Sequence, residues 1–219
     1  NVSHDIKTPL TSIVNYVDLL RRPHTPEQEA EYLEVLARQS GKLKKLTEDL
    51  VEMSKASAGS LPCRPVPRRV RELVEQAVGE YADRLAAAGL EPVLALPENS
   101  AACMADGALI WRVLDNLLGN ACKYAQPGTR LYIDGSLADD HVTLSFKNIS
   151  REALNISADE LMERFVRGDA SRSTEGSGLG LNIAKSLMEL QGGSLSLSID
   201  GDLFKAQLIL PRAADIPSP

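Results

Sequence analysis

The chain has 219 residues, of which 43% are hydrophobic and 4% aromatic, and its formal net charge is -6. This length permits one large core or two small ones, while the acidic balance and the few aromatic residues exclude a nucleic-acid surface. Cys63, Cys103 and Cys122 lack paired spacing, which excludes a disulfide framework and a zinc site and favours a reducing, cytoplasmic setting. No run approaches the ~20 apolar residues of a membrane span, so we expect a soluble chain without membrane contact.

The first predicted element is an amphipathic helix over residues 2 to about 22, in which apolar side chains recur at spacings of three and four. It carries His4 near its start, with Asp5 beside it and Thr8 one turn further. An imidazole can accept phosphate through one nitrogen while a carboxylate such as Asp5 holds the other as a donor. A surface histidine is the alternative for this position alone. Because the chain opens inside a helical pattern without methionine, we expect a fragment of a longer protein.

A second helix is expected from Pro26 to about Ala58, with Thr25 as its cap and Pro26 in its first turn. Residues 1–58 therefore predict an antiparallel helical hairpin. Such a hairpin buries little apolar surface by itself, so we expect two copies to pair as a homodimeric four-helix bundle.

Residues 59–69 contain three prolines and predict a linker to a second domain over 70–212, followed by a disordered tail over 213–219. The expected elements of the second domain are helices over 70–85, 106–124 and 179–190, and strands over 92–96, 131–136, 141–147, 194–199 and 204–210. Strand pairs with alternating polarity, interleaved with helices, predict an α+β sandwich. We expect its sheet to be mixed, largely antiparallel and covered by helices on one face.

Polar side chains gather on one face of the helix expected over 106–124. Asn116 and Asn120 are four residues apart, and Lys123 and Tyr124 follow three and four residues later. Carboxamide oxygens suit Mg²⁺, which prefers oxygen ligands shared with phosphates. The alternative is a solvated helix face.

A glycine-rich segment, Gly176-Ser177-Gly178-Leu179-Gly180, immediately precedes the last predicted helix. Glycines let backbone amides approach an anion closely, and a helix start offers unpaired N–H groups, so phosphate is the expected guest. The segment lacks the Lys-Ser/Thr ending of a P-loop and does not follow a strand as a Rossmann fingerprint would. A flexible hinge is the remaining alternative.

These motifs together resemble a known family. Residues 114–124 resemble the N box, and residues 176–181 the G2 box, of the GHKL ATPase superfamily. Residues 3–11, Ser-His-Asp-Ile-Lys-Thr-Pro-Leu-Thr, look like the H box of the sensor histidine kinases of two-component systems. The order of H box, hairpin, N box and G2 box is similar to that family over nearly the whole chain.

The resemblance implies a role for each matching residue. Asn120, supported by Asn116, would hold Mg²⁺ against the phosphates of ATP, and Lys123 and Tyr124 would contact phosphate or ribose. Phe165 would pack a mobile lid and Arg167 would reach toward phosphate. The glycine-rich segment would shape the phosphate contacts of the lid through Gly176, Ser177, Gly178, Leu179 and Gly180.

One position departs from the family pattern. Where the G1 box usually has an aspartate that receives the adenine amino group, this chain has Asn148, and no glycine follows in residues 149–153. Asn148 still offers a carbonyl oxygen, but a neutral acceptor makes a weaker hydrogen bond than a carboxylate. We therefore expect weaker nucleotide binding than in the family.

The function implied by the resemblance is ATP-dependent autophosphorylation of His4 and transfer to an aspartate on a response regulator, with Thr8 serving the reverse phosphatase reaction. The alternatives are a pseudokinase or dimeric scaffold with impaired turnover, and a GHKL ATPase that does not use His4. The parent protein is expected in the bacterial plasma membrane with this fragment on its cytoplasmic side. Whether His4 is served by its own subunit or its dimer mate stays open.

Overall fold

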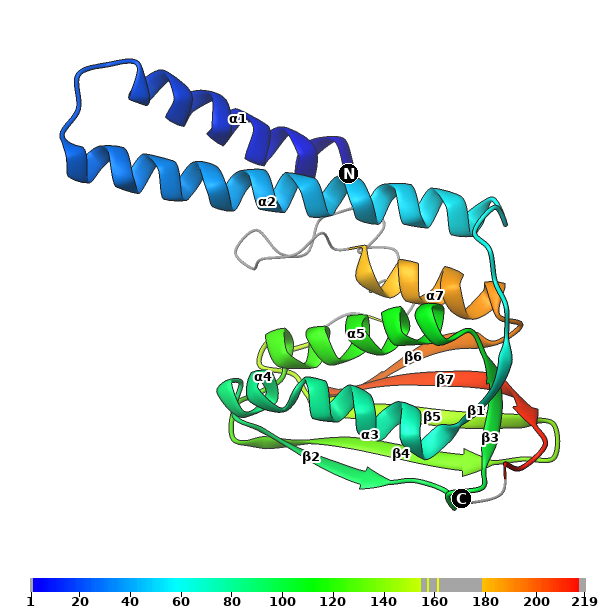
Figure 1. Ribbon diagram of the computed structural model, residues 1–219. Helices are drawn as coiled ribbons and strands as arrows, with labels where there is room; N and C mark the ends of the chain where they lie inside the picture. Colours follow the sequence, from blue (N-terminus) through cyan, green and yellow to red (C-terminus); the bar gives the residue numbers. More distant parts are fainter. Residues whose placement is uncertain (1, 155–156, 158–160, 162–178, 217–219) are drawn as a thin grey trace.

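A long helical hairpin lies along one side of a layered α/β domain (Figure 1). The computed structural model describes residues 2–154, 157, 161 and 179–216, with side chains from residue 5 onward. None of the helices within these ranges combines the length and apolar character that crossing a bilayer requires.

The hairpin consists of α1 (Val2–Leu20) and α2 (Pro26–Ser57). Thr25 caps α2 as expected, and it does so in a reciprocal capping box: Thr25 Oγ1 accepts from the Gln28 N–H at 3.3 Å, and Gln28 Oε1 accepts from the Thr25 N–H at 2.9 Å. Near the turn, the rings of Tyr16 and Tyr32 meet edge to face with centroids 5.6 Å apart. The predicted antiparallel hairpin is therefore confirmed.

The second domain is built on one seven-stranded sheet. Its strands are β1 (Val66–Arg69), β2 (Leu90–Ala95), β3 (Ala102–Ala105), β4 (Thr129–Leu137), β5 (His141–Ile149), β6 (Ser194–Asp200) and β7 (Leu203–Ala213). The strand order is β1-β3-β7-β5-β4-β2, and β6 also pairs with β7. Only the β2–β4 pair is parallel among these described strands. The sheet is mixed and largely antiparallel, as predicted.

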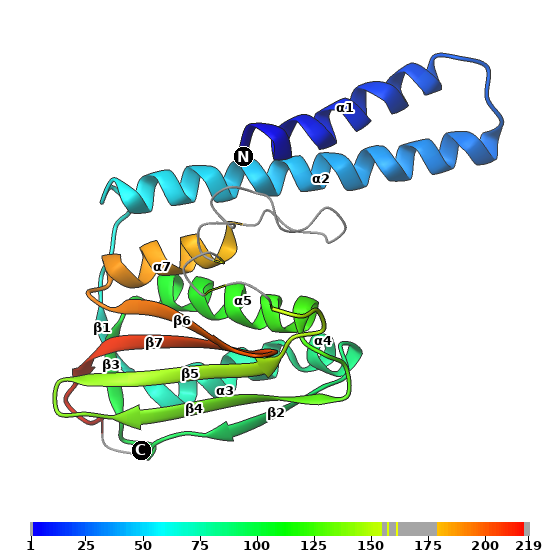
Figure 2. The same ribbon diagram turned by 180° about the vertical axis from the view of Figure 1, so that it is seen from behind.

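Helices cover one face of this sheet, as Figures 1 and 2 show from opposite sides. They are α3 (Val70–Glu80), α4 (Ala82–Ala87), α5 (Gly107–Tyr124) and α7 (Gly180–Leu190). Along β5 the buried side chains alternate as Val142, Leu144, Phe146 and Asn148. This alternation packs one side of the strand under the helices, and it puts Asn148 on the same side as the apolar core.

The structure differs from the sequence expectation in several places. Strand β3 (Ala102–Ala105) was not expected. The linker expected over 59–69 ends earlier, because Val66–Arg69 form the edge strand β1 paired with β3. The helix expected over 70–85 is broken at Tyr81 into α3 and α4. Residues 213–216, expected in a disordered tail, are held in place, since Ala213 pairs with Ala102 and the Ile216 N–H donates to Ser100 O at 2.8 Å; residues 217–219 lie outside the described ranges.

The two domains contact each other along the C-terminal half of α2, which extends beyond α1 and lies over α7 and α5 (Figures 1 and 2). Ala56 of α2 is buried and belongs to the same apolar core as the helices of the sheet domain, with Met53 packed against it. The end of the hairpin is thus part of the interior of the second domain.

Candidate functional site

The apolar stripe of α5 and its N-cap determine which face of the helix points toward the sheet. The buried residues of α5 are Leu109, Ile110, Val113, Leu114, Leu117, Leu118 and Ala121. Asp106 Oδ1 accepts from the N–H groups of Ala108 at 3.0 Å and Leu109 at 3.2 Å, and Asp106 Oδ2 accepts from the Arg64 N–H at 2.9 Å. Because the stripe faces the sheet, the polar residues predicted to bind nucleotide lie on the opposite, partly exposed face.

The carboxylate of Asp106, which caps α5, has a pKa that is shifted by the hydrogen bonds it accepts. The backbone N–H of Arg64, followed by those of Leu109 and Ala108, lowers the pKa of Asp106 below its ordinary value against the opposing effect of burial. Gln191, at the end of α7, accepts from the Asp106 N–H at 2.9 Å. The start of α5 is therefore tied to the end of α7, which fixes how these two helices lie against each other.

Asn116 lies directly against the start of α7. A Cβ added to Gly180 would lie 2.8 Å from Asn116 Oδ1, a distance that real Cβ contacts do not reach. Asn116 Nδ2 is buried and has no hydrogen-bond partner in the described part of the chain. A buried donor without an acceptor is costly, so this geometry fits a site in which a ligand oxygen accepts from the carboxamide.

Asn120, Lys123 and Tyr124 continue the same face toward the end of α5, and all three are partly exposed. Lys123 Nζ lies 5.6 Å from the centroid of the Tyr124 ring. The Arg151 N–H donates to Tyr124 O at 2.8 Å, and Ala125 forms a bridge with Ser150. These bonds bring the end of β5, with Asn148, to the end of α5.

Asn148 is 7% exposed, and its Nδ2 donates to Ile149 O at 3.2 Å. Its side chain therefore lies in the layer between the sheet and the helices. The structure thus gathers the asparagines, Lys123, Tyr124 and the start of α7 at one end of the domain.

The glycine-rich segment is described only at its end. Leu179 is buried, at 3% exposure, and occupies the N-cap position of α7 without a side-chain cap bond, while Gly180 is the first residue of the helix. Such a helix start offers backbone N–H groups to an anion. The predicted site residues Gly176, Ser177, Gly178, Phe165 and Arg167 lie outside the described residues.

The predicted phosphotransfer residues lie in the first turns of α1. His4 is in the helix, although its side chain is outside the described part of the structure, and Asp5 and Thr8 follow one turn apart. Asp5 is partly buried and Thr8 is exposed. In both views α1 lies on the side of α2 that faces away from the sheet domain, and its start is beside the middle of α2, level with the start of α7 (Figures 1 and 2).

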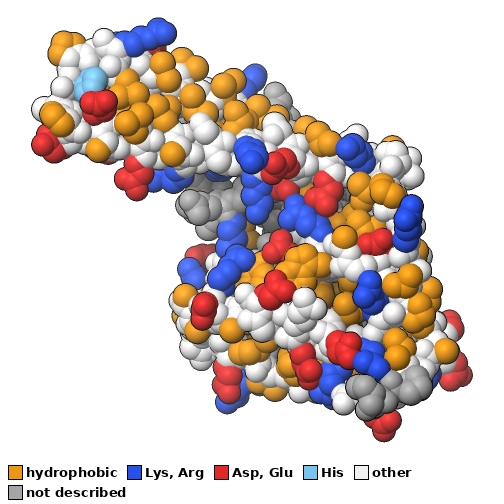
Figure 3. Space-filling view, in the orientation of Figure 1, with side chains coloured by type: hydrophobic (Ala, Val, Ile, Leu, Met, Phe, Trp, Pro, Cys, Tyr) orange, Lys and Arg blue, Asp and Glu red, His pale blue; other side chains and the backbone are white. Residues whose placement is uncertain are grey.

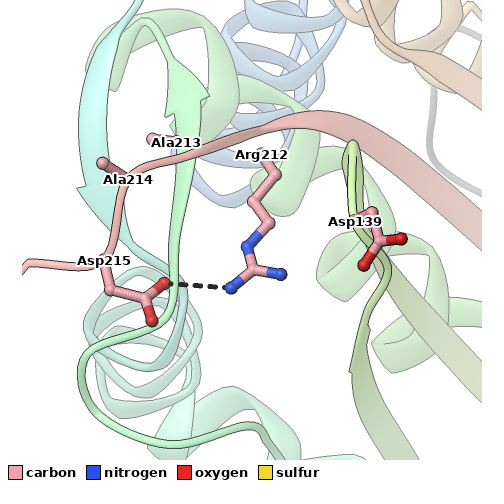
Figure 4. Close-up of a pocket in the computed structure, with 5 residues that line it drawn as sticks. All are labelled: Asp139, Arg212, Ala213, Ala214 and Asp215. Atoms are coloured by element: carbon pink, nitrogen blue, oxygen red, sulfur yellow. Dashed lines mark hydrogen bonds and ion pairs between the residues drawn. The ribbon is translucent and has the colours of Figure 1, made fainter.

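A shallow pocket at the other end of the sheet contains none of the predicted site residues (Figure 4). Its lining residues are Asp139, Arg212, Ala213, Ala214 and Asp215, around a volume of about 430 Å³. Arg212 is already engaged there, since Nη1 donates to Ala138 O at 3.0 Å and Nη2 pairs with Asp215 at 3.3 Å. This pocket does not compete with the α5–α7 end as the candidate nucleotide site.

Comparison with known proteins shows to which class of proteins a chain with this arrangement of domains belongs. Residues 1–59 match the His Kinase A (phospho-acceptor) domain, and residues 105–213 match the Histidine kinase-, DNA gyrase B-, and HSP90-like ATPase. The chain belongs to the sensor histidine kinases, with a phospho-acceptor hairpin followed by an ATPase domain.

Individual relatives agree with this class. The chain is 30% identical to the sensor protein VanS of Enterococcus faecium over 222 residues, and 30% identical to the signal transduction histidine-protein kinase BaeS of Escherichia coli over 200 residues. These alignments cover 98% and 89% of this chain but 56% and 42% of the relatives, so the chain spans about half the length of each.

Solved structures share the fold over nearly the whole chain. The Acinetobacter baumannii histidine kinase AdeS superposes with a TM-score of 0.75 at 22% identity, covering 95% of this chain and 97% of that one. The histidine kinase ThkA, in complex with response regulator protein TrrA, also gives a TM-score of 0.75, at 17% identity, covering 97% of this chain and 60% of that one. The predicted fold class is confirmed.

Proposed function

We propose that this chain transfers the γ-phosphoryl group of ATP to His4 and passes it on to an aspartate of a response regulator. The observation that carries the proposal is the close contact between Asn116 and Gly180, in a chain that also carries a phospho-acceptor helix. The Nδ2 group of Asn116, a buried donor without an acceptor among the described residues, is suited to a phosphate oxygen, and the Oδ1 atom beside the start of α7 is suited to a phosphate-bound cation.

Asn120 and Asn116 would hold Mg²⁺ through their side-chain oxygens, and Mg²⁺ would neutralise charge on the ATP phosphates. Lys123 adds a positive charge at the end of the same helix face, and Tyr124 adds a ring beside it. Asn148 would accept the adenine amino group through its carbonyl oxygen. The segment before Gly180 would supply backbone N–H groups to the phosphates.

The first transfer forms a nitrogen–phosphorus bond at the His4 ring while the bond from the γ-phosphorus to the bridging oxygen breaks, and ADP leaves with that oxygen. Asp5 would hold the other ring nitrogen and fix the tautomer. In the second transfer, a carboxylate oxygen of the regulator attacks the phosphorus, and the nitrogen–phosphorus bond breaks. Thr8, one turn from His4, would orient water for the reverse, phosphatase reaction.

The hairpin would act as a homodimer. Apolar side chains gather along the outer surface of the hairpin (Figure 3), and the large exposed ones include Leu10, Val14, Val17 and Leu33. Val14 is 52% exposed and Leu33 51% exposed in one copy. A contiguous apolar strip of this kind is expected at an interface, and a two-fold pairing would complete a four-helix bundle.

The response regulator partner is proposed from the class of the chain, together with the printed complex of the related kinase ThkA with TrrA. We also propose that this chain is the cytoplasmic part of a membrane-anchored sensor, because it belongs to the sensor histidine kinases; the relatives VanS and BaeS extend well beyond the matched region. The phosphotransfer hairpin would occupy 1–58 and the ATP-binding domain about 70–212.

The test is incubation of the chain with γ-³²P-labelled ATP and Mg²⁺. We expect label on the protein that is acid-labile and alkali-stable, as a phosphohistidine is, and no label on His4→Ala. His141→Ala serves as the matched control, because His141 lies in β5 at the far side of the sheet domain from the hairpin. Label that persists on His4→Ala would contradict the proposal.

A second candidate function is a signalling scaffold with impaired turnover, and a single observation favours it. The buried residue at the adenine-acceptor position is the neutral Asn148, whose hydrogen bond lacks the assistance of a charge. This candidate predicts that calorimetry detects the dimer but no heat of ATP binding with Mg²⁺ at millimolar nucleotide.

A further inference from the structure

A partly buried ion-pair cluster joins the two domains at a place that the phosphotransfer chemistry does not use. Arg112 of α5 pairs with Asp49 of α2 (Nη2 to Oδ1, 2.6 Å), with Glu52 of α2 (Nε to Oε2, 3.0 Å) and with Asp115 of α5 (Nη1 to Oδ2, 3.3 Å). The Asp49 side chain is only 4% exposed, and the Arg112 side chain is 25% exposed. We call these four residues the Arg112 cluster.

This cluster specifies one docked geometry. The guanidinium group is planar and its N–H groups point in fixed directions, so it meets two carboxylates of α2 only when the helices are in one register. Removing the arginine would leave the Asp49 carboxylate in the interface without this partner, which is far costlier than losing an exposed pair. Burial lowers the pKa of Arg112, but the hydrogen bond to Glu52 and the nearby carboxylates outweigh it and raise the pKa above its ordinary value.

The cluster is also braced within the sheet domain. The Tyr81 hydroxyl donates to Asp115 Oδ1 at 2.5 Å, and the Arg84 guanidinium lies 4.2 Å from the Tyr81 ring centroid. Asp115 in turn holds Arg112. The arginine is therefore oriented by the sheet domain before it reaches α2.

Arg112 shares its helix face with the asparagines of the candidate nucleotide site. Asn116 and Asn120 follow Arg112 by four and eight residues, so they lie on the same stripe, about 6 and 12 Å further along α5. A shift of Arg112 along α2 would move both asparagines by the same amount, because α5 is one rigid helix.

The Arg112 contacts fix the position of α5 along the axis of the hairpin. This position puts Asn116 and Asn120 at about the same height along that axis as His4. The Tyr16–Tyr32 contact makes those two positions level in the antiparallel hairpin. His4 is twelve residues before Tyr16 and Lys44 is twelve residues after Tyr32, so the His4 backbone is level with about Lys44.

The positions on α2 that lie opposite Asn116 and Asn120 can be counted in the same way, starting from the Arg112 cluster. The chain direction of α5 is opposite to that of α2 in both views (Figures 1 and 2). Starting from the Arg112 contacts at 49 and 52, four residues along α5 correspond to about positions 45–48 of α2, and eight residues to about 41–44. Both asparagines thus fall within about one helical turn of the level of His4.

We propose that Arg112 is a positioning residue, which sets the axial register of the ATPase domain on the hairpin so that the nucleotide site stands level with His4. This inference rests on the proposed function and deepens it. In a four-helix bundle with its two-fold axis along the helices, both His4 residues are at one level. The register therefore serves transfer within a subunit and transfer between subunits equally.

The test compares Arg112→Gln, Arg112→Lys and Asp49→Asn with the wild-type chain, using Arg130→Gln as the control. Arg130 also pairs with a glutamate, Glu91, at 3.3 Å, but on the exposed surface away from α2. Three quantities are measured: the initial autophosphorylation rate at saturating ATP, the KM for ATP, and hydrogen exchange of the amides over 46–56 by mass spectrometry.

We expect Arg112→Gln to lower the saturating rate by about tenfold to a hundredfold, the size of effect that a small displacement of reacting groups produces. The KM for ATP should stay within about twofold of the wild-type value, because the nucleotide residues are untouched. Amides over 46–56 should exchange faster, Arg112→Lys should recover part of the rate, and Arg130→Gln should match the wild type.

Three results would overturn the inference while leaving the proposed function intact. The first two are a wild-type or raised saturating rate in Arg112→Gln and a loss confined to KM. The third is unchanged hydrogen exchange of the amides over 46–56 together with a lowered autophosphorylation rate, since the ATPase domain would then still be docked on the hairpin. A wild-type chain that never labels His4 is a different outcome, because it removes the proposed function itself and the positioning role with it.

Discussion

Asn116 on α5 and Gly180 at the start of α7 approach so closely that a Cβ on residue 180 would lie 2.8 Å from Asn116 Oδ1. This contact joins the two elements that the sequence assigns to metal and phosphate, and it leaves room for a Cβ at residue 180 only if the Asn116 side chain moves. A substitution there therefore tests the candidate site with a single methyl group.

Gly180→Ala should displace the Asn116 carboxamide and weaken binding of ATP with Mg²⁺ by about tenfold or more, a loss that corresponds to roughly 1.4 kcal/mol. Isothermal titration calorimetry measures this constant directly. Gly79→Ala is the matched control, because Gly79 is also helical and a Cβ there meets nothing within 4 Å. Equal affinity of Gly180→Ala and the wild type would show that the contact is not part of the nucleotide site.

Asn148→Asp should strengthen nucleotide binding. A carboxylate at this buried position would accept the adenine amino group with charge assistance, which roughly doubles the strength of a hydrogen bond, so we expect about a threefold to tenfold lower Kd for ATP. The same change should leave the Kd for inorganic triphosphate unaltered, which serves as the control. Weaker ATP binding by Asn148→Asp would indicate that this side chain does not face adenine.

Asp106→Asn should expose the contribution of the cap carboxylate to stability. Because hydrogen bonds from the Arg64, Leu109 and Ala108 N–H groups lower the pKa of Asp106 in the folded state, its charge stabilises the fold above the unfolded pKa of about 3.9. That stabilisation is lost as the pH falls through the lower, folded pKa. Asparagine keeps one acceptor oxygen for the Ala108 and Leu109 N–H groups. Its NH2 group cannot accept from the Arg64 N–H, so the substitution removes the charge together with that hydrogen bond.

Urea denaturation measures this effect. The free energy of unfolding of the wild type should exceed that of Asp106→Asn at pH 7, and the difference should shrink as the pH falls below about 4. A difference that does not change with pH would mean that the carboxylate charge is not what stabilises the start of α5.

Val14→Glu should convert the proposed dimer into a monomer. Val14 is 52% exposed in one copy, and burying a carboxylate at the centre of a bundle interface without a partner costs several kcal/mol. Sedimentation equilibrium reports the mass in solution. Leu137→Glu, a change of an exposed residue in β4 of the other domain, should leave the mass at that of the wild type. If wild type and Val14→Glu sediment as the same species, the hairpin face is not the interface.

Strong periodicity explains which parts of the fold the sequence predicted. The stripe of α5 and the alternation of β5 each bury one face, so both elements and the helix face on which Asn116 lies could be predicted. The strand was expected to end at residue 147, so the burial of Asn148 within β5 was not predicted. The edge strand β1 could not, because its four residues, Val-Pro-Arg-Arg, are too short to alternate and three of them are exposed. Proline is tolerated there only because the strand lies at the edge.

Two other features depended on tertiary contacts. The helix breaks at Tyr81, whose hydroxyl bonds Asp115, 34 residues away in the sequence. Asp49 stands in α2 among many charged residues, and nothing in the local pattern distinguishes it from the solvated ones. The carboxylate is buried and paired only because α5 docks on α2, which brings Arg112 Nη2 to 2.6 Å from Asp49 Oδ1.

The most direct test of the account is mass-spectrometric mapping of phosphate on the intact chain after incubation with ATP and Mg²⁺ at alkaline pH. The account predicts one added phosphoryl group, located on His4, and its loss when a receiver domain with its aspartate intact is added. Release of ADP without modification of His4, or modification at another residue, would contradict it.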